Sequence, residues 1–113
     1  MNISELAGAF ERVRSLSFPC DSVCEETGEL HAELALYDTT MAGIITTLIK
    51  TGRVSPAYVI LLKPDSDLRT RLQAAMKSHC SIVALDALRY LEYLDALEEA
   101  VQLAARELLP GTG

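Results

Sequence analysis

The sequence predicts an all-α fold, a four- or five-helix bundle with two long helices and shorter helices packed across them. The long helices are expected at about 22–51 and about 82–109, where apolar residues alternate at intervals of four and three positions. This spacing places them on one helix face and is typical of helices that pack together. Half of the residues are apolar and 23% are charged, so the chain can bury a core and keep a solvated surface. We expect a single domain over 1–113.

The first helix is expected from about Ile3 to Ser17. Asn2 can cap it, and Glu5, three residues further on, completes a capping box. Pro19 stops the segment, because the residue before a proline avoids the helical conformation. The apolar face of this helix consists of Ile3, Leu6, Phe10 and Val13.

The first long helix begins with a Ser-x-x-Glu capping box at Ser22. Gly52 can end it, since glycine readily adopts the left-handed conformation that follows many helices. Gly28 and Gly43 lie inside this helix, and each lowers helix stability by about 1 kcal/mol relative to alanine. Either glycine could allow another backbone to approach closely. Gly28 could instead mark a later start. The apolar seam, with threonine as its polar member, consists of Val23, Thr27, Leu30, Leu34, Tyr37, Met41, Ile44 and Leu48.

The region between the long helices has two interpretations. Pro56 is a good first helical residue, yet Tyr58–Leu62 also has the length and composition of a short buried strand. With the helix that follows and Ile82–Leu85, it could form a strand–helix–strand unit. A sheet of two parallel strands leaves both edges bare, so the helical interpretation is preferred.

Two more helices complete the prediction. The shorter one is capped by Asp65 or Ser66 and runs to about His79, and the last one occupies about 82–109. Residues 110–113 are expected to fray. The seam of the last helix consists of Val83, Ala87, Tyr90, Leu94, Leu97, Val101, Ala104 and Leu108.

The composition excludes several classes of partner. The net charge is −6 and the basic residues do not cluster, whereas nucleic-acid binding needs cations to replace phosphate counterions. Anionic membrane surfaces are disfavoured for the same reason. The N-terminus lacks the features of a signal peptide, and no apolar run approaches the roughly 18 residues of a membrane span. The chain has three cysteines, an odd number that cannot form a closed set of disulfide bonds. Because thiols stay reduced in the cytosol, a cytoplasmic location is expected.

Two pairs of acidic residues are spaced three apart, Glu26 with Glu29 and Glu92 with Asp95. Such pairs share a helix face, and two of them on facing helices could hold Mg²⁺ through carboxylate oxygens. The pattern resembles that of the all-α nucleotide pyrophosphohydrolases. The resemblance implies that the four acids bind Mg²⁺ and that the protein cleaves a nucleoside triphosphate. Alternatively, these acids occupy solvated helix faces, since Glu92 points away from the apolar seam of its helix.

The cysteines and histidines suggest two further hypotheses. Cys20 and Cys24 have a spacing that zinc sites permit, if His79 and Cys80 come alongside. A cysteine at 24 or 80 could also form a catalytic pair with His31 or His79, although neighbouring helix positions diverge by 100° and exclude direct activation of Cys80 by His79. The alternative is that these thiols are packing residues or partly exposed side chains.

The first half of the last helix is apolar on several sides, so it needs cover on several sides. A homodimer would supply that cover, because two-fold dimers are the commonest small oligomers and tyrosines are enriched at such contacts. Alternatively, the preceding region covers this face within one chain. The expected interface consists of Leu85, Leu88, Tyr90, Leu91 and Tyr93.

The favoured function is a non-enzymatic helical interaction protein or small-ligand-binding protein that acts as a homo-oligomer without a cofactor. The Mg²⁺-dependent pyrophosphohydrolase is the alternative. No P-loop, dinucleotide-binding or Gly-x-Ser-x-Gly motif is present. An apolar ligand would need a cavity in the bundle, expected between Tyr37, Met41, Tyr58, Tyr90 and Leu94.

Overall fold

A computed structural model describes residues 3–19 and 25–108 of the chain, and confirms the all-α bundle with two long helices. No strand occurs within these residues, and none of their helices is long and apolar enough to cross a bilayer. The expected frayed tail, residues 110–113, lies outside the described residues. The helices are α1 (Ile3–Ser15), α2 (Glu25–Thr51), α3 (Pro56–Val59), α4 (Ser66–Ala75) and α5 (Ser81–Leu108).

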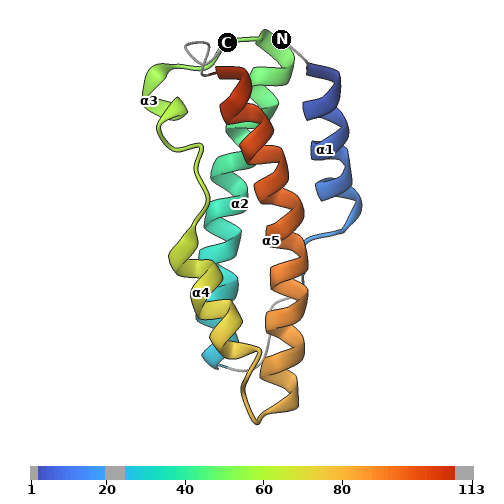
Figure 1. Cartoon of the computed structure of the whole chain (residues 1–113), viewed down its shortest axis with the longest axis vertical. Helices are drawn as coiled ribbons and strands as arrows, with labels where there is room; N and C mark the ends of the chain where they lie inside the picture. Colours follow the sequence, from blue (N-terminus) through green and yellow to red (C-terminus); the bar gives the residue numbers. More distant parts are fainter. Residues whose placement is uncertain (1–2, 20–24, 109–113) are drawn as a thin grey trace.

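The long helix α5 is the centre of the bundle and packs against α1, α2 and α4 (Figure 1). The helices α2 and α5 run in the same direction, while α1 and α4 run antiparallel to them on opposite sides of α5. The molecule is a rod with extents of 46 × 24 × 19 Å. With 13 residues against 28, α1 covers only the C-terminal half of α5.

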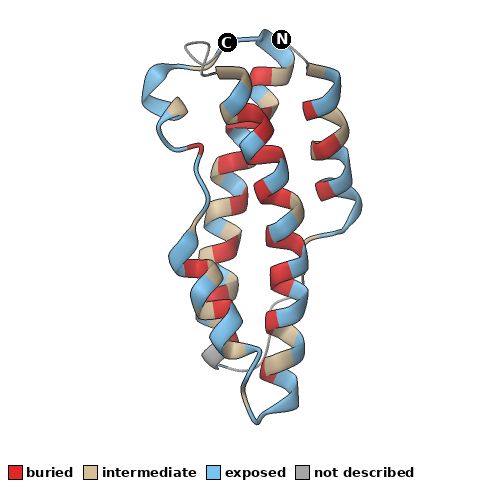
Figure 2. Cartoon of the chain, in the orientation of Figure 1, coloured by how far each residue is buried: buried red, intermediate tan, exposed pale blue. Residues whose placement is uncertain are grey.

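The seams predicted for the two long helices form the core (Figure 2). Leu34 and Leu48 of α2 are fully buried, as are Leu94 and Leu97 of α5. Thr27, the polar member of the α2 seam, is also buried and donates a hydrogen bond to Asp86 of α5 (3.2 Å). Val23, the first predicted seam residue, lies outside the described part of the chain.

The structure corrects the region between the long helices. Tyr58–Leu62 is not a strand, because α3 and the turn after it use i→i+3 and i→i+4 backbone hydrogen bonds. Ile82–Leu85 belongs to α5, so the strand–helix–strand alternative is wrong. The short helices also end earlier than predicted. The last residue of α1 is Ser15, and α4 stops at Ala75.

The glycines differ in role. Gly52 ends α2 with a φ of 73°, and its N–H donates to the Leu48 carbonyl oxygen (2.8 Å), as the sequence indicates. Gly28 and Gly43 have no neighbouring atom within 4 Å of the place a Cβ would occupy. The close backbone approach considered for them is therefore absent.

A buried polar network joins α1 to the long helices. Arg14 Nη2 lies 2.5 Å from Asp38 Oδ1 of α2 and donates a hydrogen bond to Tyr93 Oη of α5 (2.6 Å). The Tyr93 hydroxyl donates in turn to the same Asp38 oxygen (2.8 Å). Three helices thus meet at one carboxylate.

Candidate functional site

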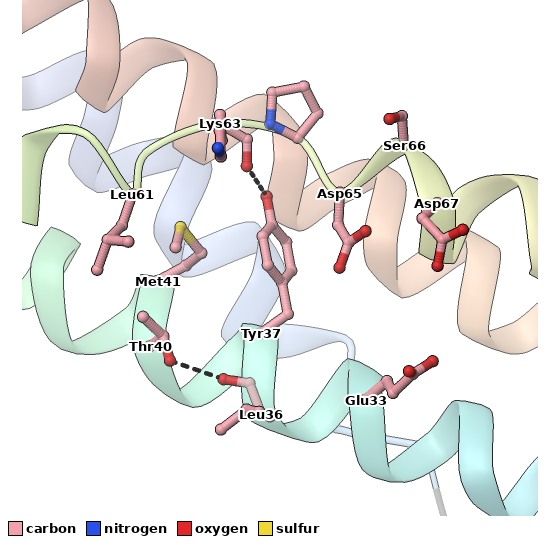
Figure 3. Close-up of a pocket in the computed structure, with 11 residues that line it drawn as sticks. Glu33, Leu36, Tyr37, Thr40, Met41, Leu61, Lys63, Asp65, Ser66 and Asp67 are labelled. Carbon is pink, nitrogen blue, oxygen red and sulfur yellow. Dashed lines mark hydrogen bonds between the residues drawn. The ribbon is translucent and has the colours of Figure 1, made fainter.

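The candidate functional site is a groove between α2 and the segment that enters α4. We call it the α2 groove; its volume is about 620 Å³, in the range of small-ligand sites. The α2 side chains form one wall, and residues 61–67 form the other (Figure 3). It is lined by Glu33, Leu36, Tyr37, Thr40, Met41, Leu61, Lys63, Pro64, Asp65, Ser66 and Asp67.

The α2 groove is polarised along its length. Leu61 and Met41 lie at one end, whereas the carboxylates gather at the other, with Tyr37 between the two ends (Figure 3). The Tyr37 hydroxyl donates a hydrogen bond to the Lys63 carbonyl oxygen (2.8 Å) and so holds the loop against α2. An apolar half and an acidic half therefore face the same space.

The acidic end contains Glu33, Asp65 and Asp67. Asp65 caps α4 by accepting a hydrogen bond from the Leu68 N–H (3.0 Å). Glu33 pairs with Arg71, and Asp67 lies 3.6 Å from the same guanidinium group. These contacts fix the carboxylates in place, and an ionised carboxylate can accept further hydrogen bonds.

Tyr37 stays neutral in this environment. Burial, and then the negative charges of Glu98 and Asp65, raise the pKa of its phenol above the ordinary value. The neutral phenol is the form that donates the hydrogen bond to the loop, so the wall of the α2 groove keeps its shape at physiological pH.

A second hollow, of about 600 Å³, lies between α4 and the N-terminal half of α5. We call it the α4–α5 hollow. Its charged residues are two cations and two anions, and apolar side chains form its floor. It is lined by Arg69, Gln73, Met76, Lys77, Leu88, Leu91, Glu92 and Asp95.

The residues expected to line one pocket do not share a cavity. Tyr37 and Met41 line the α2 groove. Tyr58 borders a separate hollow further along α2. Tyr90 and Leu94 are fully buried in the core, because the helices fill the space that a ligand would need.

The residues expected at a dimer interface are divided between core and surface. Tyr90, Leu91 and Tyr93 are buried within one chain. Phe18, three residues after the end of α1, packs edge-on against Tyr93 with 5.1 Å between ring centroids, so the loop that follows α1 covers this side of α5. Leu85 and Leu88 remain exposed.

The four acids proposed for Mg²⁺ are not gathered into a site among the described side chains, which contain no group of three or more metal-binding residues. Asp95 forms an ion pair with Arg69 (2.6 Å). Glu29 and Glu92 are exposed on different helices. The side chain of Glu26 lies outside the described part.

The thiol and imidazole hypotheses also lack support from the described residues. Cys20 and Cys24 lie outside them. His31 packs against the ring of Phe18 (5.1 Å between centroids), and its Nε2 lies 2.9 Å from a backbone carbonyl oxygen, so it serves the packing. Cys80 is exposed on the loop before α5.

Sequence reasoning missed the α2 groove because its two walls are far apart in the chain. The sequence contained one signal, since Leu36 lies off the α2 seam, and the structure leaves it 70% exposed. In the loop before α4, the sequence predicts Asp65 or Ser66 only as a helix cap. Comparison with known proteins adds no further information, since no family model, curated protein or solved structure matches the chain.

Proposed function

We propose that this chain is a non-enzymatic binding protein, and that its α2 groove takes a small molecule with an apolar body and a protonated amine. The observation that carries the proposal is the polarity of the α2 groove, with an apolar half and a half bearing three carboxylates. A mixed lining of this kind, with few convergent polar groups, is typical of ligand sites.

The apolar half provides most of the expected affinity. Leu36 and Leu61 expose side-chain surface that a ligand would cover, and the buried Met41 also lines the groove. Covering apolar surface stabilises a complex by about 25 cal/mol per Å². The methionine side chain is flexible, so it can adapt to ligands of different shape.

The acidic half selects the sign of the ligand's charge. Three carboxylates line the α2 groove, against Lys63 in the lining and Arg71, which forms ion pairs with two of these acids. The acids still outnumber the bases, so the local charge is negative, as is the net charge of the chain. The ring of Tyr37 beside these acids offers an additional contact to a cation, worth about 0.5–1 kcal/mol at a partly exposed site. Glu33 and Met41 are eight residues apart on α2, which sets a span of about 12 Å for the ligand.

The proposal is tested by calorimetric titration with n-octylamine, n-octanol and octanoate. We expect the amine to bind more tightly than the alcohol, and octanoate to bind least. Asp67→Asn combined with Glu33→Gln should weaken amine binding by about three- to tenfold, since each exposed ionic contact contributes about 0.2–1 kcal/mol. The same variant should leave octanol binding unchanged.

Two matched variants complete the test. Leu61→Ala should weaken amine and alcohol binding together, because it removes apolar surface without removing charge. Glu11→Gln, an exposed acid on α1, should change neither affinity. Equal binding of amine and octanoate, or amine binding that the groove variants do not alter, would rule out the proposed site.

We also propose a cytoplasmic location for this binding protein. Its odd number of cysteines supports that location. Titration of the unfolded protein from its native source should find three free thiols per chain, whereas a mixed disulfide would argue for an oxidising compartment.

A further inference from the structure

The N-terminal half of α5 exposes apolar side chains beyond the reach of α1. Ile82 is 54% and Leu85 is 55% exposed, and Leu88 is also exposed, as is Met76 at the neighbouring end of α4. A helix of 13 residues spans about 20 Å, about half the length of α5, so α1 cannot cover them. We call these four residues the α5 strip.

The α5 strip overlaps the α4–α5 hollow, because Met76 and Leu88 line that hollow together with Leu91. The projecting residue Leu85 precedes Leu88 by one helical turn, about 4.5 Å along the axis. From this arrangement we propose that two copies of the chain pair through their α5 helices, antiparallel about a two-fold axis between Leu85 and Leu88. Each Leu85 then enters the partner's hollow beside Leu88, so both projections and both hollows are filled.

The balanced charges of the α4–α5 hollow favour a second copy as its occupant. The chain carries a net charge of −6, so two copies repel each other unless they meet at a neutral surface. Two cations and two anions line the α4–α5 hollow, and Arg69 already pairs with Asp95 there (2.6 Å). The α2 groove, where three acids outnumber Lys63 and the adjacent Arg71, is a less favourable surface for a second acidic copy.

The antiparallel register also brings opposite charges together. An axis between Leu85 and Leu88 places the first turn of one α5 beside Glu92 of the other. That first turn contains no acidic residue, and a helix N-terminus carries a partial positive charge. Lys77, on the edge of the same hollow, adds a positive charge near this contact.

Sedimentation velocity over a range of concentrations tests this proposal. The wild-type chain should change from monomer to dimer in the micromolar range, as expected of a small interface. Leu85→Glu should raise the dissociation constant by roughly 100-fold, because it places an unpaired charge in an apolar contact. Leu85 is exposed, so this variant should fold, which a thermal melt verifies. Leu36→Glu, an equally apolar exposed position on α2, should dimerise like the wild type.

The orientation is tested by cross-linking in a variant whose native cysteines are replaced by serine. A mixture of Leu85→Cys and Leu88→Cys chains should form disulfide-linked heterodimers faster than either chain alone forms homodimers, since antiparallel pairing brings residue 85 beside residue 88. A protein that stays monomeric at high concentration, or a Leu85→Glu variant that still dimerises, overturns the proposal. Preferential 85–85 and 88–88 links overturn the antiparallel arrangement.

This interface is independent of the amine site. Leu85→Glu should weaken dimerisation and leave octylamine binding unchanged, while Leu61→Ala should weaken octylamine binding and leave dimerisation unchanged. Either proposal can therefore fail without the other.

Discussion

Asp38 is a buried carboxylate, 8% exposed, whose charge is balanced by Arg14 of α1. Removing that partner leaves a negative charge in a poorly solvated place. We expect Arg14→Ala to lower the free energy of unfolding by about 1–3 kcal/mol, as measured by urea denaturation. The cost is moderated because the Arg14 side chain is itself partly exposed.

Arg12 provides the matched control for that experiment. It lies on the same helix and pairs with Glu99 at 3.3 Å, but both side chains are more than half exposed. Arg12→Ala should therefore cost at most about 1 kcal/mol. Equal losses for the two variants would show that the buried network does not hold α1 to the bundle.

Two tyrosines make the fold sensitive to alkali. Burial, and then Asp38, raise the pKa of Tyr93, while burial, Glu98 and Asp65 raise the pKa of Tyr37. A raised folded-state pKa gives stability that is complete below about pH 10, the unfolded value, and is lost as pH rises further. Each tyrosine should contribute a loss of at most about 1.4 kcal/mol per pH unit there.

Urea denaturation between pH 8 and pH 11 measures this effect. Stability should fall above about pH 10 in the wild type, and Tyr93→Phe should reduce the slope of that fall. At pH 8, the same substitution should cost about 1 kcal/mol through the lost hydrogen bond to Asp38. A stability that does not change over this range would contradict the assignment of both phenols.

At the level of helices, the long elements were the predictable part of the fold. Their seams repeat over many turns, and the structure buries the residues that the repeat selects, from Leu34 of α2 to Leu97 of α5. The short segments were less predictable because local propensity decides little there. Tyr58–Leu62 has the composition of a strand, but no neighbouring strand exists in the described chain to pair with it, so the backbone bonds locally instead.

The seams give a direct prediction of stability. Leu34 and Leu97 are both fully buried, so Leu34→Ala and Leu97→Ala should each lower the free energy of unfolding by about 2–5 kcal/mol. Leu36→Ala is the control, because that leucine is exposed on the same helix as Leu34. Near-neutral effects for both buried leucines would contradict the bundle packing.

Replacement by alanine should have opposite effects on stability at Gly43, inside α2, and at Gly52, just after it. Gly43 is helical and has open space around its missing Cβ, so Gly43→Ala should raise stability by about 0.5–1 kcal/mol. Gly52 has a φ of 73°, so Gly52→Ala should be destabilising by about 1 kcal/mol. Thermal melts of the two variants should therefore shift in opposite directions; shifts of the same sign would contradict the assigned backbone conformations.

At the level of the whole molecule, the candidate sites depended on contacts that the sequence does not reveal. The sequence predicts Tyr90 and Tyr93 at a dimer contact, but both are buried within the chain, where Tyr90 packs against His31 of α2 and Tyr93 packs against Phe18. The α2 groove exists because Tyr37 holds the Lys63 loop against α2, a contact across 26 residues. Periodicity reports which face of a helix is apolar, and it does not report which neighbour covers that face.

The central claim is that the polarised α2 groove binds an amphipathic amine. The most direct measurement is a two-dimensional amide NMR titration of the labelled protein with n-octylamine. The account predicts saturable shifts confined to the amides of residues 33–41 and 61–67, and smaller shifts there with n-octanol. Shifts spread over the whole surface, or confined to the α4–α5 hollow, would contradict it.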